Sequence, residues 1–366
     1  MVLFETLATD PFTHIRTLGP ENSSVRRVCE VKCADNGEVY ARKEFIFRAY
    51  DKDKLAEMAQ NEASIIKSIR HHHIVEFWGT HCIEKEQMFG LLIRPVADKS
   101  LAEFFRQAEE ERYVEHYKVM CQLPMCLFQA LDYLHEEKIR HRDIKPSNIL
   151  IKDNRVYLTD FGESKSFRDA ATSKTQSMDC ARTDRYMAPE VDNDERRGRA
   201  TDVWALGCTI LEICTVASGN TIQQLDKHLL EGTSHKYFFT SPYYVLDWIY
   251  LLFSSPGIDT QVGQHVQKIL QLAFLMLDPD DKKRVTMKQL LSLLNRQDST
   301  YFRSIACLAC DRCQGASKQQ NYDAQFDCTF RTTSSGGVYI PSKDGITSQT
   351  QEPWEVFRQR WCRTRY

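Results

Sequence analysis

The chain has 366 residues, of which 42% are hydrophobic and 27% are charged, and its formal net charge at pH 7 is −2. This composition is ordinary for a globular protein of two or three domains. The small net charge gives no indication of a nucleic-acid partner. No apolar run approaches the roughly 18 residues of a transmembrane helix, so no membrane span is predicted.

The cysteine content gives an expectation for the cellular compartment of the protein. The chain has 13 cysteines, and its first ten residues, with Glu5 and Asp10, do not have the basic-then-apolar pattern of a signal peptide. An odd number of cysteines without a signal peptide predicts reduced thiols in a cytoplasmic or nuclear protein. The oligomeric state is left open by the sequence.

The hydrophobic pattern divides the chain into three parts. Residues 12–94 are predicted to form strands and one helix, and residues 95–296 to form mainly helices. Residues 297–366 are rich in Ser, Thr, Gln and Cys with weak periodicity, so we expect a partly irregular tail.

Residues 39–45 alternate as a β-strand does. The alternation places Lys43 on the same face as Val39, Ala41 and Phe45. An unpaired ammonium group among apolar side chains is costly, so Lys43 is expected to need an anionic partner.

Residues 51–69 are predicted to form a helix, and Glu62 lies in the middle of its apolar stripe. The other residues of the stripe are Leu55, Met58, Ile65 and Ile69. A carboxylate in this position also needs a partner. The pattern alone leaves two arrangements open, in which Lys43 pairs with Glu62 or both side chains extend to water.

Three motifs follow in the helical part: His141-Arg142-Asp143-Ile144-Lys145-Pro146-Ser147-Asn148, then Asp160-Phe161-Gly162, then Ala188-Pro189-Glu190. A lone Asp-Phe-Gly is usually a turn, and a lone His-Arg-Asp is usually a solvated polar cluster. Together and in this order they resemble the eukaryotic protein kinase superfamily, serine/threonine type, over residues 12–296.

The resemblance implies a phosphoryl-transfer site with ATP and Mg²⁺. In it Asp143 would orient the substrate hydroxyl or accept its proton, and Lys145 would contact the γ-phosphate, with Thr183 placed against both. Asn148 and Asp160 would bind Mg²⁺, which prefers hard oxygen ligands. The substrates implied are the Ser and Thr hydroxyls of proteins.

The resemblance also implies a nucleotide site in the first part of the chain. Lys43 would contact the α- and β-phosphates of ATP while paired with Glu62, which favours the paired arrangement left open above. The remaining ATP-binding residues implied are Gly19, Val28 and Ala41. The implied fold is two-lobed α+β, with a small antiparallel β-rich lobe carrying one helix, a larger helical lobe, a hinge near residues 93–97, and nucleotide between the lobes.

The expected glycine-rich loop is degenerate, because Gly19 is the only glycine in residues 18–28. One alternative is therefore a pseudokinase scaffold with weak or no ATP turnover. A second alternative is a small-molecule phosphotransferase of related fold, against which Lys145, Thr183 and the Ala188-Pro189-Glu190 motif argue. The family also pairs the Glu of that motif with an arginine, here Glu190 with Arg284. The segment at residues 215–263 is longer than the family core requires, and we interpret it as an insertion that packs on the helical part.

The tail contains a second cluster of possible function. Cys307, Cys310 and Cys313 form a C-x₂-C-x₂-C run that is followed by Cys328. Four thiolates can hold Zn²⁺, but the second half of this set lacks its own C-x₂-C spacing. Reduced cysteines are therefore the default interpretation, and a zinc site is the alternative.

Overall fold

The computed structural model of the 366-residue chain describes residues 5–7, 10–19, 26–46, 52–83, 87–167, 184–192, 198–254, 261–295, 310 and 312–313. The chain forms two compact units, one of residues 1–101 with 136–170 and the other of residues 102–135 with 171–366. The sequence-based division at residues 94 and 296 stays a prediction.

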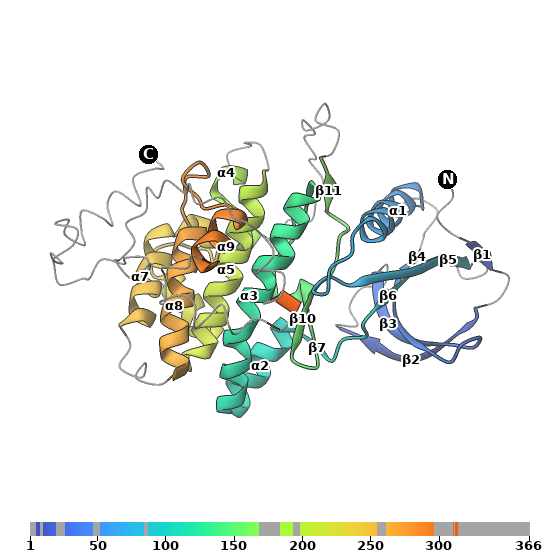
Figure 1. Ribbon diagram of the computed structural model, residues 1–366, viewed down its shortest axis with the longest axis horizontal. Helices are drawn as coiled ribbons and strands as arrows, with labels where there is room; N and C mark the ends of the chain where they lie inside the picture. Colours follow the sequence, from blue (N-terminus) through green and yellow to red (C-terminus); the bar gives the residue numbers. More distant parts are fainter. Residues whose placement is uncertain are drawn as a thin grey trace. The chain divides into compact units, whose positions relative to one another are not determined.

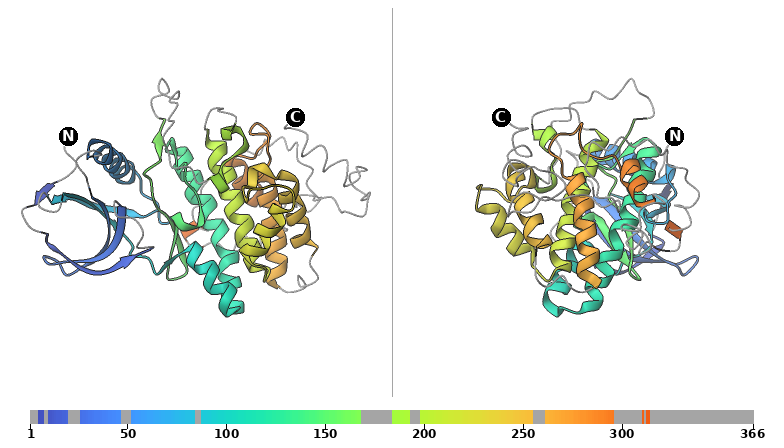
Figure 2. Two further views of the ribbon diagram at one scale, coloured as in Figure 1. Left: turned by 180° about the vertical axis from the view of Figure 1, so that it is seen from behind. Right: turned by 60° about the vertical axis from the view of Figure 1, so that its left-hand side comes forward.

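The first unit is built on a six-stranded sheet with the strand order β1-β5-β6-β4-β3-β2 (Figures 1 and 2). All neighbouring strands are antiparallel except β1 and β5. The strands are β1 (Glu5–Leu7), β2 (Phe12–Leu18), β3 (Arg26–Cys33), β4 (Val39–Ile46), β5 (Glu76–Ile83) and β6 (Met88–Arg94). The predicted helix is α1 (Lys52–Ser68), which packs on β4, β5 and β6.

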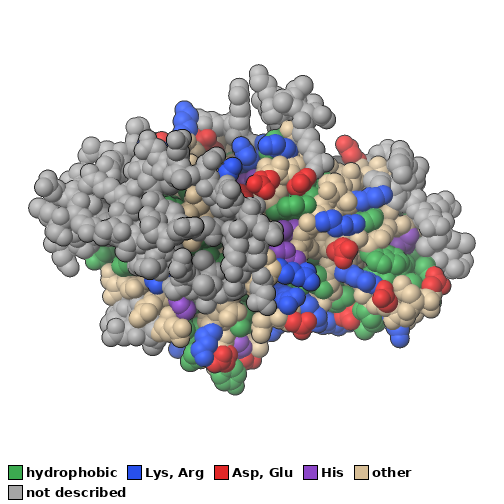
Figure 3. Space-filling model, viewed as in Figure 1, with side chains coloured by type: hydrophobic (Ala, Val, Ile, Leu, Met, Phe, Trp, Pro, Cys, Tyr) green, Lys and Arg blue, Asp and Glu red, His purple; other side chains and the backbone are tan. Residues whose placement is uncertain are grey.

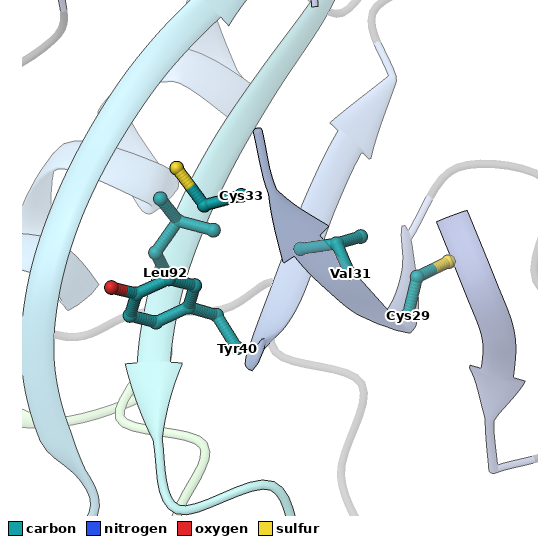
Figure 4. Packing of buried hydrophobic residues seen from close by; sticks show 5 residues of the cluster. All are labelled: Cys29, Val31, Cys33, Tyr40 and Leu92. Carbon is teal, nitrogen blue, oxygen red and sulfur yellow. The ribbon is translucent and has the colours of Figure 1, made fainter. Parts of the chain in front are cut away.

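Strand β4 is buried on both faces, although β-strand alternation alone indicates only which residues share a face. On one face Lys43 lies opposite Val28 and Leu91 in the ladder. On the other face Tyr40 belongs to a small hydrophobic cluster (Figure 4). The other members of this cluster are Cys29, Val31, Cys33 and Leu92. The sheet therefore has a packed interior on the side opposite Lys43.

The rest of the first unit consists of short elements that surround one loop, residues 141–145. Strand β8 (Ile139–Arg140) precedes the loop and pairs with β11 (Lys165–Ser166). The 3₁₀ helix η2 (Pro146–Asn148) follows it and leads into β9 (Ile149–Lys152). Strand β9 lies between β7 (Lys99–Ser100) and β10 (Arg155–Leu158). These pairings hold both ends of the loop in place.

The second unit is helical. Its helices are α2 (Leu101–Glu111), α3 (Val114–Glu136), α4 (Pro189–Asp192), α5 (Arg199–Ala217), α6 (Ile222–Leu230), α7 (Pro242–Phe253), α8 (Gln261–Met276) and α9 (Met287–Asn295), with 3₁₀ turns η4 (Asp184–Tyr186) and η5 (Phe238–Thr240). Helix α5 packs against α6, α7 and α8. The two-part α+β fold predicted from the sequence is therefore confirmed.

The described part of residues 215–263 packs on the helical unit as predicted, because α6 and α7 contact α5 and α7 contacts α8. Helix α6 begins with a capping box in which Thr221 and Gln224 bond each other's backbone N–H groups. The indole Nε1 of Trp248 on α7 donates to Oγ1 of Thr215 on α5, at 2.9 Å. Phe238 between these helices is fully buried. The buried side chains of α6, η5 and α7 therefore contribute to the hydrophobic core of the second unit.

Among the described residues one helix, α5, is long and apolar enough to cross a membrane, but 94% of its apolar stretch is buried inside the protein. Packing as a core helix explains this composition. On the face drawn in Figure 3, described side chains of both charge signs are interspersed.

Candidate active site

Lys43 is the centre of a group of three charged side chains in the first unit, of which Lys43 and Glu62 are buried and Asp160 is partly exposed. Its Nζ donates to both carboxylate oxygens of Glu62, at 2.9 and 2.8 Å, and to Oδ1 of Asp160, at 2.6 Å. The exposed fractions of the Lys43 and Glu62 side chains are only 11% and 2%. The predicted pairing of strand lysine with helix glutamate is therefore present, and Asp160 joins it.

The environment of these three groups shifts their pKa values. Burial opposes the charge of Lys43, but the carboxylates of Asp160 and Glu62 outweigh it and raise the lysine pKa. The nearby Lys43 ammonium holds the pKa of Asp160 well below its usual range. Burial raises the pKa of Glu62, with Lys43 acting in the opposite direction. Lys43 thus stays protonated and Asp160 ionised near neutral pH.

The backbone after β10 directs Asp160 toward Lys43. Asp160 has a φ of +62°, a left-handed conformation that is uncommon outside glycine. The next residue, Phe161, is fully buried, with its ring 4.8 Å from that of His141. The backbone N–H of Phe161 also donates to the Glu62 carboxylate. The Asp-Phe-Gly motif is therefore anchored at Phe161, directly after Asp160.

The loop between β8 and η2 holds Asp143. Nζ of Lys145 lies 2.8 Å from Oδ2 of Asp143, and Nδ2 of Asn148 donates to both the backbone oxygen and Oδ2 of Asp143, each at 2.8 Å. Buried His141 fixes the start of the loop, because its Nε2 donates to the Thr159 carbonyl at 3.0 Å. Asp143 is thereby oriented by a cation and an amide.

The two groups of side chains are adjacent within the first unit. The backbone N–H of Thr159, next to Asp160, donates to the carbonyl of Asn148 at 3.1 Å. The charge of Lys145 also acts on Asp160, whose pKa it lowers. The structure therefore brings together the predicted residues Lys43, Glu62, Asp143, Lys145, Asn148 and Asp160.

The donor set fits Mg²⁺. Asn148 uses its amide nitrogen for Asp143, and Asp160 uses Oδ1 for Lys43. The described residues supply no hydrogen bond to Oδ1 of Asn148 or Oδ2 of Asp160. One amide oxygen and one carboxylate oxygen are therefore available as metal ligands. Hard oxygen ligands of this kind, supplemented by water and phosphate, are what Mg²⁺ requires.

The other predicted site residues have different outcomes. Val28 is the cross-strand neighbour of Lys43, and Ala41 is buried two residues before Lys43 on the same face. Gly19 directly follows β2 and has a φ of +81°, a conformation that glycine adopts without strain. Their roles toward nucleotide stay predictions. Thr183, the loop at 20–25, Cys307 and Cys328 lie outside the described residues.

A buried polar cluster on the opposite face of β4 was missed by the sequence reasoning. Arg42 is 4% exposed and pairs with Asp10 at 2.6 Å and with fully buried Glu44 at 2.7 Å. Arg27 also contacts Glu44. Two charges at alternate positions beside Tyr40 were the available signal. The cluster is structural, since its members bond one another.

In the second unit, the predicted pair of Glu190 and Arg284 is confirmed. Nη1 and Nη2 of Arg284 donate to the two carboxylate oxygens of Glu190, at 2.7 and 2.9 Å. The exposed fractions of their side chains are 0% and 6%. This bidentate pair fixes the start of α4 to the segment after α8.

Comparison with known proteins agrees with this arrangement. The protein kinase domain family matches residues 12–293. The chain is 29% identical over 282 residues to mitogen-activated protein kinase kinase kinase A of Dictyostelium discoideum, which covers 74% of this chain and 27% of the relative. It is 33% identical over 186 residues to human mitogen-activated protein kinase kinase kinase 4, covering 50% and 11%. It is 24% identical over 289 residues to a probable serine/threonine-protein kinase nek2 of D. discoideum, covering 77% and 62%.

The chain belongs to the protein kinase family. The match spans less than two thirds of the length of each of these relatives.

Proposed function

We propose that this protein transfers the γ-phosphoryl group of ATP to Ser and Thr hydroxyls of protein substrates. The observation that carries the proposal is the convergence of Lys43, Glu62 and Asp160 with the loop that holds Asp143. The names of the relatives, which include serine/threonine-protein kinases, support the same reaction class.

In phosphoryl transfer the protein contributes mainly by positioning the reactants and neutralising their charge. Lys43, fixed by Glu62, would hold the α- and β-phosphates, and Lys145 would contact the γ-phosphate. Asp143, oriented by Lys145 and Asn148, would align the substrate hydroxyl or accept its proton. Mg²⁺ held by Asn148 and Asp160 would neutralise phosphate charge.

Two alternatives predict different behaviour. A pseudokinase scaffold keeps the fold without turnover, and the degenerate loop after Gly19 is the only sequence feature that favours it. The complete set of charged site residues argues against it. A small-molecule phosphotransferase would phosphorylate small alcohols, and Lys145 with the Ala188-Pro189-Glu190 motif favours protein acceptors instead.

The test is a γ-phosphate transfer assay with generic protein acceptors and with small-molecule alcohols. We expect transfer to protein by the wild type and a loss of at least roughly 10²-fold in Asp143→Asn, the scale of a general base. The matched control is Asp153→Asn, the same change at an exposed aspartate of the β9–β10 turn, which should keep wild-type transfer. Equal rates in wild type and Asp143→Asn would refute the role of Asp143. Nucleotide binding without any transfer would favour the scaffold.

A further inference from the structure

Three cysteine side chains gather in the second unit. Cys126 lies on α3, while Cys310 and Cys313 come from the segment after α9. The Cys313 thiol is hydrogen-bonded to the thiols of both Cys126 and Cys310. The Sγ atoms of Cys310 and Cys313 lie within 4.8 Å of each other. The cluster therefore combines sulfur atoms from two distant parts of the chain.

The cluster is enclosed by the protein. Cys313 is 0% exposed and Cys126 is 6% exposed, while Cys310 is partly buried. Nε2 of Gln129, three residues after Cys126 on the same side of α3, donates to the Cys313 carbonyl at 3.1 Å. This bond fixes the backbone that carries Cys313 beside α3 (the short orange segment in Figure 1).

We propose that Cys126, Cys310 and Cys313 form a zinc-binding site that ties the segment after α9 to helix α3. Zn²⁺ is bound by thiolates at about 2.3 Å in tetrahedral geometry, which places neighbouring sulfur atoms about 3.8 Å apart. The separation of Cys310 and Cys313 and the mutual contacts of Cys313 are compatible with that spacing. A fourth ligand, either water or a further side chain, would complete the coordination.

This ligand set differs from the one that the sequence suggested. The C-x₂-C spacing of Cys310 and Cys313 belongs to the predicted run, but Cys126 lies on α3 and has no sequence spacing that marks it. The structure supplies the missing observation, because it brings the buried thiol of Cys126 on α3 to Cys313. A bound zinc ion accounts for the gathering of three thiols better than a disulfide does. A disulfide would join two sulfur atoms and leave the third, whereas a zinc ion uses all three as thiolates.

The first measurement is metal content of the full chain, purified under reducing conditions from cells grown with zinc. We expect one zinc per chain in the wild type. Cys126→Ala and Cys313→Ala should each weaken zinc affinity by more than roughly tenfold. Substitution of residues that only hydrogen-bond to metal ligands and orient them already has effects of that size. The matched control is Cys121→Ala, which removes another buried thiol of α3, whose pKa burial raises to about 12. This variant should keep its zinc.

A second measurement keeps the proposal testable if the variants fail to fold. The metal-free wild type is titrated with Co²⁺, which replaces Zn²⁺ and reports its ligands by absorption. We expect sulfur-to-cobalt charge-transfer bands and the visible bands of tetrahedral cobalt, both displaced by Zn²⁺. Wild-type protein without zinc and without these bands would overturn the proposal. An intramolecular disulfide within the cluster, found by intact mass under non-reducing conditions, would overturn it equally.

Discussion

The ammonium of Lys43 on β4 bonds both carboxylate oxygens of Glu62 on α1, nineteen residues further along the chain. Neither charge is tolerable alone where it lies, because the two side chains are 11% and 2% exposed. The ion pair thus couples the sheet to α1. Asp160 shares the same ammonium, so the pair also holds the Asp-Phe-Gly motif.

Removing the lysine should therefore destabilise the first unit. Lys43→Met leaves Glu62 buried without its cation, and we expect the free energy of unfolding to fall by about 3–5 kcal/mol. Urea denaturation followed by circular dichroism measures this loss. The double variant Lys43→Met with Glu62→Leu removes the stranded carboxylate and should recover most of the loss. Equal destabilisation of single and double variants would contradict the argument.

The bidentate pair of Arg284 and Glu190 predicts a comparable effect in the second unit. Arg284→Ala strands a buried carboxylate, so we expect a loss of about 3–5 kcal/mol in the free energy of unfolding. Arg284→Lys should restore little, because a lysine cannot donate two parallel bonds. The neighbouring Lys283, whose side chain is 59% exposed in its ion pair with Asp280, is the control. Lys283→Ala should change stability by less than about 1 kcal/mol.

The sequence predicted the parts of the site that depend on periodicity and motif order. The strand pattern at 39–45 and the stripe around Glu62 each showed a charge in an apolar setting, and one partner for each was the simplest solution. The motif order then located Asp143 and Asp160. The strand, the helix and the positions of these two aspartates could be predicted because each depends on residues that are close together in the sequence.

Contacts between distant segments could not be predicted in this way. Arg42 and Glu44 have the alternation of a face open to water, but the packed interior of the sheet covers that face. Cys126 is one of many buried residues of α3, and only the tertiary structure places it beside Cys313. A sequence pattern shows which residues lie on the same face of a strand or helix. The partner that each of them contacts in the folded protein depends on tertiary packing.

His81 on β5 predicts a pH dependence of stability. It is 3% exposed, and the described residues supply no hydrogen bond to its ring nitrogens. Burial, with Arg42 acting in the same direction and Asp10 and Glu44 against it, lowers the pKa of His81 from 6.5 to about 4. Between these values the unfolded chain binds a proton that the folded chain does not. Stability is therefore lost as the pH falls through this window.

The size of this effect follows from the two pKa values. From about pH 7 to about pH 5, His81 should lower the free energy of unfolding by about 2 kcal/mol. Urea denaturation at both pH values, for the wild type and for His81→Leu, isolates this contribution from other groups that titrate. The variant should lose correspondingly less stability over the same interval. An identical pH dependence in both proteins would show that His81 does not remain neutral in the folded state.

The His81 ring also explains why β6 has glycine at position 90. The two residues are paired in the β5–β6 ladder, and a Cβ on Gly90 would overlap the His81 ring. We expect Gly90→Ala to destabilise the protein by about 1–3 kcal/mol, the cost of overpacking, as measured by urea denaturation. In a His81→Ala background the same change should cost much less, because the ring is gone. Gly79→Ala on β5, where a Cβ meets no atom within 4 Å, is the control and should be close to neutral. If Gly90→Ala is equally costly with and without the ring, a feature of the strand other than His81 requires the glycine.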